Sequence, residues 1–182
     1  MKVIQTKING LYIIKPHIFE DERGYFFESY SKMAFESAGL FYDFVQDNQS
    51  KSSYGTVRGL HFQKGEHAQA KLVRVLEGSV LDVAVDLRRA SPTYGQYITV
   101  ELSGENKLMM LIPRGFAHGF SVLSETAVFS YKCDNLYCKE SEGGIRFDDP
   151  TLAINWRIDM EKALTSDKDK LLPYLAEFET CF

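Results

Sequence analysis

The stretch SVLDVAVDLR, residues Ser79 to Arg88, alternates between two sets of side chains with a period of two residues. The two faces of an extended strand would carry Val83, Val85 and Leu87 on one side and Asp82, Ala84 and Asp86 on the other. Because successive side chains of a strand point to opposite faces, this alternation is typical of a β-strand against a core. The stretch therefore predicts a β-rich fold.

Further short, β-prone runs lie on both sides of this stretch. They are LYIIK (11–15), FVQDNQS (44–50), VRGLHF (57–62), KLVRVLE (71–77), YITVEL (97–102), KLMMLI (107–112), HGFSVLS (118–124) and TAVFSYKC (126–133). Turn signals recur about every 8–12 residues, which is typical of a sandwich or barrel and not of alternating strands and helices. We expect one all-β domain over residues 1–182.

Two segments carry helix signals. Residues 31–39, SKMAFESAG, open with a capping serine, Ser31, and close with a glycine. Near the C-terminus, Ser166 and Asp169 have capping-box spacing, with Asp in place of the usual Glu, and Pro173 would interrupt or end that helix. The expected helices are therefore few, short and peripheral.

The composition sets limits on partners and location. Hydrophobic residues make up 45% of the chain and charged residues 25%, and the net charge is −4. A net acidic chain argues against a general nucleic-acid binder. No apolar run approaches the roughly 20 residues of a membrane span, and the N-terminus has no signal-like apolar region. Three scattered cysteines, Cys133, Cys138 and Cys181, suit reduced thiols, so we expect a cytoplasmic protein without membrane contact.

A short motif refines the fold. IPRGFAHGF, residues 112–120, contains Pro113, Gly115 and His118 in a P-x-G-x-x-H pattern. This pattern resembles the second motif of the cupin superfamily, which implies a jelly roll, or double-stranded β-helix. The partner motif in metal-binding cupins is H-x-H, but residues 61–63 read HFQ. A catalytic metal site needs about three protein ligands, so we expect neither a bound metal nor a cofactor.

Longer blocks extend this resemblance over nearly the whole chain, from about Ile4 to about Leu172. Taken in order, they are DERGYFFESY (21–30), FVQDNQS (44–50), VRGLHFQ (57–63), AQAKLVRVLEGSVLDVAVDLR (68–88), SPTYGQ (91–96), IPRGFAHGF (112–120), YKCDNLYCKESEGGI (131–145) and SDKD (166–169). In content, order and approximate spacing they resemble the dTDP-4-dehydrorhamnose 3,5-epimerase family. That family inverts C3 and C5 of a 4-keto-6-deoxyglucose attached to dTDP.

The resemblance implies a catalytic set for this reaction. Inversion next to a ketone needs a base, a stabiliser for the developing oxyanion and an acid on the opposite face. His61 matches the family's base, and Asp169 matches the carboxylate that orients it. Lys71 matches the cation near the sugar carbonyl, and Tyr131 matches the opposing acid. No metal or redox cofactor is required in principle.

The resemblance also implies a substrate-binding set and a homodimer. The residues that match it are Phe19, Arg23, Phe26, Glu28, Gln46, Asn48, Arg58, His118, Tyr137 and Glu142. Arginines can bond phosphate oxygens in a fork, and aromatic rings can stack on a base. We expect His118 to support the site without reacting. In the family, a strand near the N-terminus packs on the partner subunit, so Arg23 would serve the neighbouring site.

One point of geometry stays open at the level of sequence. In a regular strand Arg58 and His61 would face opposite ways, because their separation is odd. Gly59 could host a β-bulge that re-aims one of them, or Arg58 could lie at a strand end.

Other interpretations compete with this one. Considered one by one, His61 could be a core histidine, Asp169 a helix-start carboxylate, Lys71 a surface lysine and Tyr131 a core tyrosine. At the level of the protein, the rivals are an epimerase that inverts one carbon of another nucleotide 4-ketosugar, a silent cupin that binds a sugar nucleotide, and a metal-dependent cupin oxygenase.

Overall fold

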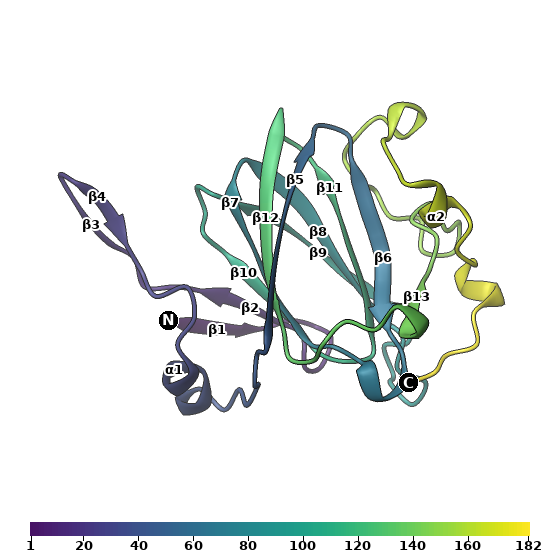
Figure 1. Ribbon diagram of the computed structural model, residues 1–182, viewed down its shortest axis with the longest axis horizontal. Helices are drawn as coiled ribbons and strands as arrows, with labels where there is room; N and C mark the ends of the chain where they lie inside the picture. The colour runs from purple at the N-terminus through teal and green to yellow at the C-terminus, as the bar shows by residue number, and fades with distance from the viewer.

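A computed structural model describes residues 1–182, and antiparallel β-sheets dominate it (Figure 1). One sheet has six strands in the order β1-β2-β10-β7-β12-β5, and another has five in the order β13-β6-β11-β8-β9. The strands of the six-stranded sheet are β1 (Lys2–Gln5), β2 (Tyr12–Lys15), β5 (Gln46–Ser53), β7 (Lys71–Glu77), β10 (Met109–Ile112) and β12 (Thr126–Cys133). Those of the five-stranded sheet are β6 (Val57–Gln63), β8 (Ser79–Asp86), β9 (Tyr97–Ser103), β11 (Phe116–Val122) and β13 (Glu142–Gly144).

The remaining elements are small. A two-stranded arm, β3 (Phe19–Asp21) and β4 (Gly24–Phe26), projects away from the two sheets (Figure 1). The helices are α1 (Lys32–Ser37) and α2 (Asp167–Lys170), and single 3₁₀ turns cover Gly65–His67, Lys139–Ser141, Met160–Lys162 and Leu175–Glu177. None of the helices has the length and apolar character needed to cross a membrane. The predicted all-β jelly roll with few short helices is confirmed.

The alternation in β8 separates two cores. Val83 and Val85 belong to a cluster that packs the five-stranded sheet against the C-terminal segment, which includes Trp156. Val80 and Ala84 belong to the cluster between the two sheets. Both faces of β8, an inner strand of this sheet, are therefore buried and shielded from water.

The sequence patterns located most elements and missed the most irregular ones. Ser31 caps α1 by accepting a hydrogen bond from the Ala34 N–H, and Ser166 caps α2 in the same way through the Asp169 N–H, as predicted. The strands β1, β3, β4 and β13 were not predicted. Every residue of β3 and β4 is exposed, and β13 has two glycines among its three residues, so none of these strands shows an apolar alternation.

The C-terminal segment reaches the two-sheet body where α2 lies. An isolated parallel bridge joins Thr56 to Leu164, and the Val57 N–H donates to the Leu164 carbonyl at 2.9 Å. This bridge brings residues 164–169 alongside the start of β6 (Figure 1).

Candidate functional site

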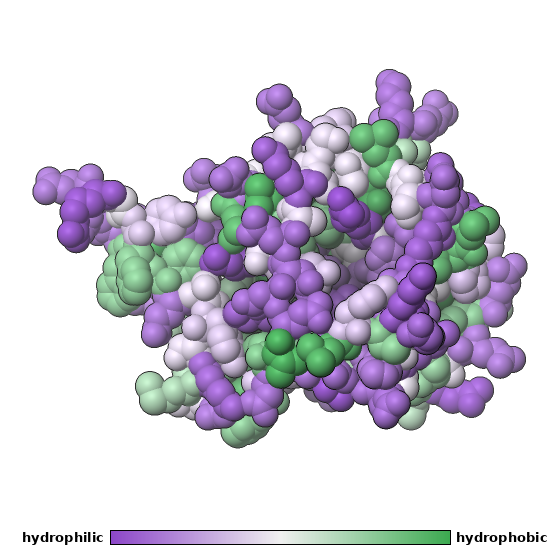
Figure 2. Space-filling view, viewed as in Figure 1, coloured by the Kyte–Doolittle hydropathy of each residue, from purple (hydrophilic) through white to green (hydrophobic).

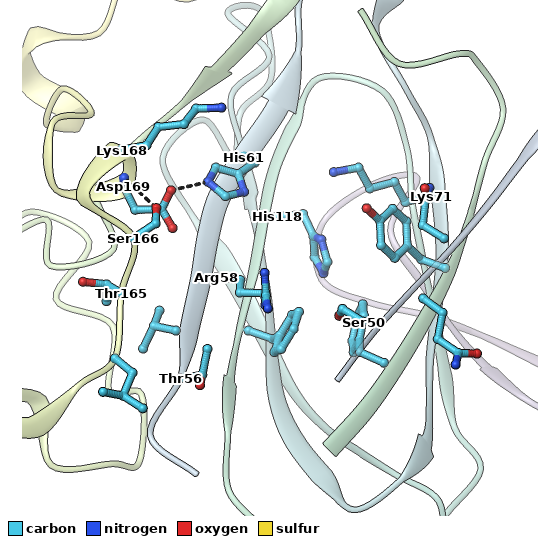
Figure 3. A pocket seen from close by; sticks show the side chains of 17 residues that line it. Ser50, Thr56, Arg58, His61, Lys71, His118, Thr165, Ser166, Lys168 and Asp169 are labelled. Carbon is cyan, nitrogen blue, oxygen red and sulfur yellow. Dashed lines mark hydrogen bonds and ion pairs between the residues drawn. The ribbon is translucent and has the colours of Figure 1, made fainter. Parts of the chain in front are cut away.

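A cavity of about 550 Å³ lies between the two sheets. Strands β5, β7 and β12 supply one wall, β6 and β11 supply the other, and residues 164–169 close one side (Figure 3). All four predicted catalytic residues line it: His61, Lys71, Tyr131 and Asp169. The structure thus brings together side chains that are far apart in the sequence.

His61 and Asp169 form a close polar contact in the cavity. His61 Nε2 lies 2.7 Å from Asp169 Oδ1 (Figure 3), and the carboxylate is buried. Although burial alone would raise it, the hydrogen bond from His61 is the main reason that the pKa of Asp169 lies below its usual value. An ionised carboxylate only accepts hydrogen bonds, so Nε2 carries the proton and Nδ1 is left with a lone pair. A neutral imidazole in this tautomer can act as a base at Nδ1.

The backbone around α2 positions Asp169. Its own N–H donates to Ser166 Oγ at 3.1 Å, which fixes the first turn of the helix. The Gly59 N–H points at Asp169 Oδ2 from 3.5 Å, a long contact that links the carboxylate to β6. The aspartate is therefore fixed by its own helix cap on one side and approached by the histidine strand on the other.

A β-bulge in β6 resolves how Arg58 and His61 can share the cavity. Arg58 is opposite Phe120, and His61 is opposite His118. The two residues between them in β6, Gly59 and Leu60, therefore lie opposite one residue of β11, Gly119. Of the two explanations that the sequence left open, the register shift selects the bulge at Gly59. Gly59 has a φ of +134°, and a Cβ on it would lie 2.5 Å from the Gly119 Cα, so only glycine fits. Arg58 lines the cavity, with its Nε donating to Ser52 Oγ at 3.0 Å.

Lys71 and Tyr131 lie across the cavity from Asp169. The Lys71 ammonium is 5.9 Å from the centroid of the Tyr131 ring, and Figure 3 shows Lys71 on the opposite side from Asp169. Burial lowers the pKa of Lys71, and the neighbouring Cys133 and Asp82 oppose part of that shift. Burial also raises the pKa of Tyr131, so its phenol is neutral and can donate a proton. A cation and a neutral acid thus face the histidine base.

A second histidine–aspartate pair lies beneath the cavity. His118 lines the cavity, and its Nε2 lies 2.9 Å from Oδ2 of Asp82, which is fully buried. Burial raises the pKa of Asp82, and His118 and Lys71 oppose the shift. His118 was predicted as a supporting residue, whereas Asp82 was not predicted. The available signal was an aspartate inside the otherwise β-prone run of residues 79–88.

A second hollow of about 310 Å³ adjoins the first and contains most of the remaining predicted residues of the body. Gln46, Asn48, Tyr137 and Glu142 line it. Lys168, which the sequence analysis did not single out, lines both hollows and forms an ion pair with Glu142. Its place directly before Asp169 in the SDKD block was the available signal.

Three predicted binding residues lie on the projecting arm, away from both hollows of their own chain. Phe19 and Phe26 are 58% and 67% exposed, and the arm carries apolar surface at the left of Figure 2. Arg23 is exposed and pairs with Asp21 within the arm, with Nη2 at 2.5 Å from Oδ2. Glu28 follows the arm, is exposed and lines neither hollow. The structure does not bring these four residues to His61 within one chain.

The side chains that could ligate a metal are not arranged as in a metal centre. No three side chains of His, Cys, Asp or Glu converge. His61 and His118 each direct Nε2 at an aspartate, and the Gln63 Oε1 accepts a hydrogen bond from the Cys138 N–H at 2.9 Å. The groups that would correspond to cupin metal ligands are thus engaged in protein hydrogen bonds.

Comparisons with known proteins agree on one family. The sequence model described as dTDP-4-dehydrorhamnose 3,5-epimerase matches residues 5–177. The dTDP-4-dehydrorhamnose 3,5-epimerase of Salmonella typhimurium is 51% identical over 176 residues, which are 96% of each chain. Among solved structures, the enzyme of that name from Elizabethkingia anophelis is 59% identical, with a TM-score of 0.93 over 97% of each chain.

A third comparison includes a bound sugar nucleotide. A dTDP-6-deoxy-D-glucose-3,5-epimerase from Legionella pneumophila, solved in complex with dTDP-4-keto-L-rhamnose, is 49% identical. Its TM-score is 0.93, and the match covers 98% of this chain and 94% of that one.

Proposed function

The chain belongs to the dTDP-4-dehydrorhamnose 3,5-epimerase family, and from that membership we propose how its cavity performs the reaction. It is an epimerase that converts dTDP-4-dehydro-6-deoxy-D-glucose to dTDP-4-dehydro-L-rhamnose in dTDP-L-rhamnose biosynthesis. Both inverted carbons lie next to the C4 ketone. Each inversion removes a proton from one face, forms an enolate and returns a proton to the other face.

His61 is the base, and its contact with Asp169 is the observation that carries the proposal. Nδ1 of His61 takes the proton from the carbon, and the C–H bonding pair moves into the enolate. The ring becomes an imidazolium, which the buried Asp169 carboxylate stabilises through the hydrogen bond at 2.7 Å. This pair supports the view that His61 is a working base and not a structural core residue.

Lys71 stabilises the enolate oxygen. Its ammonium faces the cavity and is paired with no carboxylate, so it is available to the charge that develops on the C4 oxygen. Such a fixed donor in a site that excludes water contributes about 10²–10³-fold to the rate. Burial lowers the pKa of Lys71 and so disfavours the ammonium, whereas the negative charge that develops on an enolate oxygen would favour it.

Tyr131 is the acid on the opposite face. Its phenol is neutral, since burial raises its pKa, and it lies beside Lys71 across the cavity. The O–H proton goes to the carbon and leaves a phenolate, while His61 holds the proton it removed. Exchange of both groups with water returns the site to its starting state, so every turnover takes up solvent hydrogen.

Substrate binding divides between the two hollows. Arg58 and Lys168 supply the cations for the diphosphate, because both line the larger hollow. The Tyr137 ring, in the smaller hollow, is the stacking surface for thymine. Asn48, His118 and Glu142 complete the polar lining.

The exposed arm supports the proposal of a homodimer. Phe19 and Phe26 expose aromatic surface that a second copy of the chain would cover, and Arg23 would then enter the partner's site. We place the enzyme in the cytoplasm, where its three unpaired cysteines would stay reduced.

Mixing two inactive variants tests this arrangement. Arg23→Ala and His61→Ala, refolded together, regain part of the wild-type activity if Arg23 acts in the neighbouring site, because one site of each mixed dimer is intact. An Arg23 that acted within its own chain would leave the mixture as inactive as its components.

Isotope uptake tests the reaction itself. With dTDP-4-dehydro-6-deoxy-D-glucose in deuterated water, NMR should show deuterium at both C3 and C5. Uptake at one carbon only would select the single-carbon epimerase. Folded protein that binds the sugar nucleotide without any uptake would be a non-catalytic binding protein, and the proposal would be wrong.

A further inference from the structure

We propose that Gln46 and Gln63 are positioning residues for recognition of the base: their side-chain oxygens fix the loop that carries Tyr137. This inference rests on the proposed role of Tyr137 as the stacking surface for thymine. It assigns a task to Gln63, the position at which metal-binding cupins carry a second histidine.

The two glutamines hold successive backbone N–H groups of one loop. The Tyr137 N–H donates to Gln46 Oε1 at 3.1 Å, and the Cys138 N–H donates to Gln63 Oε1 at 2.9 Å. Gln46 belongs to β5 of the six-stranded sheet, and Gln63 belongs to β6 of the five-stranded sheet. The loop between β12 and β13 crosses from one sheet to the other at this point (Figure 1). It is thus pinned once to each sheet.

The orientation of both side chains is determined. Gln46 Nε2 donates to Asn48 Oδ1 at 3.0 Å, so Gln46 Oε1 is the atom left to face the loop. Gln63 is 5% exposed, and a buried polar side chain is stable only when it is hydrogen-bonded. Its partner is the Cys138 N–H. The two oxygens are therefore held in place before any ligand binds.

Apolar burial does little to hold this loop. Leu136 and Tyr137 are 60% and 52% exposed, so their side chains do not anchor it in the core. Further polar contacts hold the start of the loop: Gln69 Nε2 donates to the Asn135 carbonyl, and Asn135 Nδ2 donates to the Glu66 carbonyl. Because polar contacts dominate, removal of one acceptor loosens the backbone that carries the tyrosine ring. A ring that must be ordered on binding lowers the affinity for the base.

The catalytic groups do not depend on this loop. His61, Arg58 and Lys71 project from β6 and β7, and the side chains of His61 and Arg58 bond Asp169 and Ser52, both outside the loop. Loss of the glutamine contact should therefore weaken recognition of thymine and leave recognition of phosphate intact. The ratio of dTDP affinity to pyrophosphate affinity isolates this effect, because only dTDP carries the base.

Calorimetry of the full-length enzyme with dTDP and with inorganic pyrophosphate tests the inference. Gln63→Met removes the acceptor and should lower the affinity ratio about tenfold, as expected for one lost hydrogen bond to a fixed N–H. KM for the sugar nucleotide should rise by a similar factor, whereas kcat changes little. Gln63→Glu keeps an acceptor oxygen and should keep the wild-type ratio, even if its charge weakens both ligands. Gln46→Met should also lower the ratio, and it replaces Gln63→Met if that variant does not fold.

Two further variants separate the possible failures. Ser121→Ala removes a buried hydrogen bond to the Trp156 carbonyl, far from the loop, and should leave the ratio unchanged. Tyr137→Ala should lower the ratio; if it does not, the proposed stacking role is wrong. If Tyr137→Ala lowers the ratio and Gln63→Met does not, or if Gln63→Met weakens both ligands equally, the positioning role is overturned.

Discussion

Replacement of Asp169 by Asn perturbs the catalytic pair at one atom. The side chain keeps its shape, but an amide replaces a carboxylate whose Oδ1 lies 2.7 Å from His61 Nε2. An NH₂ group in that place would face the N–H of the present tautomer. The histidine therefore turns to the other tautomer, with its proton on Nδ1, the atom that must accept the proton of the substrate.

Two losses determine how far the rate of the Asp169→Asn enzyme falls. The imidazolium loses a charge-assisted hydrogen bond from a carboxylate that is 3% exposed, which is about 1.5–3 kcal/mol, or roughly 10- to 150-fold in rate. Reversal of the tautomer adds to this loss. We expect kcat/KM to fall by at least about 10²-fold, with KM little changed, since the proposed role of Asp169 is to support His61 and not to bind the nucleotide.

Deuterium uptake at C3 and C5 is the assay, and Asp149→Asn is the matched control. Asp149 is 2% exposed and accepts hydrogen bonds from the N–H groups of Thr151, Leu152 and Leu175, away from the cavity. Its replacement should lower stability and leave the activity of the folded fraction intact. A folded Asp169→Asn enzyme within about threefold of the wild-type rate would refute the reasoning.

Three other predictions concern the acid, the bulge and a stabilising carboxylate. Tyr131→Phe should still exchange deuterium, because His61 can return the proton to the same face, while NMR shows inverted product falling about 10²-fold. Uptake and inversion that fall together would contradict this. Gly59→Ala should lower the free energy of unfolding by about 2–5 kcal/mol in urea, because of its positive φ and the contact with Gly119. Gly24 also has a positive φ, but a Cβ on it would contact no other atom, so Gly24→Ala should lower the free energy of unfolding clearly less. Although burial alone would raise it, hydrogen bonds from Arg88, Ser91 and Thr93 lower the pKa of Asp86 to about 2. A depressed pKa stabilises the fold above about pH 4, and this stability is lost as the pH falls towards about 2. Asp86→Asn should cost about 2 kcal/mol at pH 7 and flatten the acid limb of the stability curve; an unchanged limb would contradict this.

The sequence predicted the regular parts of the fold because their patterns are local. The alternation in residues 79–88 marked β8, and the serine caps marked both helices. The strands of the arm, β3 and β4, were not predicted because they bury no side chain in their own chain. Their sequence therefore has no alternation of apolar and polar residues.

The site residues could be predicted only through the family resemblance, because the spacing of residues in a sequence does not show which side chains meet in the fold. His61 and Asp169 are 108 residues apart, and no local pattern connects them. Sequence parity left two explanations for Arg58 and His61, and the register of β6 against β11 was needed to select the bulge. Asp82 was missed because alternation says which face a residue occupies but not whether that face is buried as well.

The proposed mechanism depends most on proton abstraction by the imidazole of His61. Its direct measurement is deuterium incorporation at C3 and C5 by a folded His61→Asn enzyme, with dTDP affinity measured beside it. We predict wild-type affinity for dTDP and no label above the enzyme-free background at either carbon. Label at either carbon at near wild-type rate would contradict the account, because another group would then be the base.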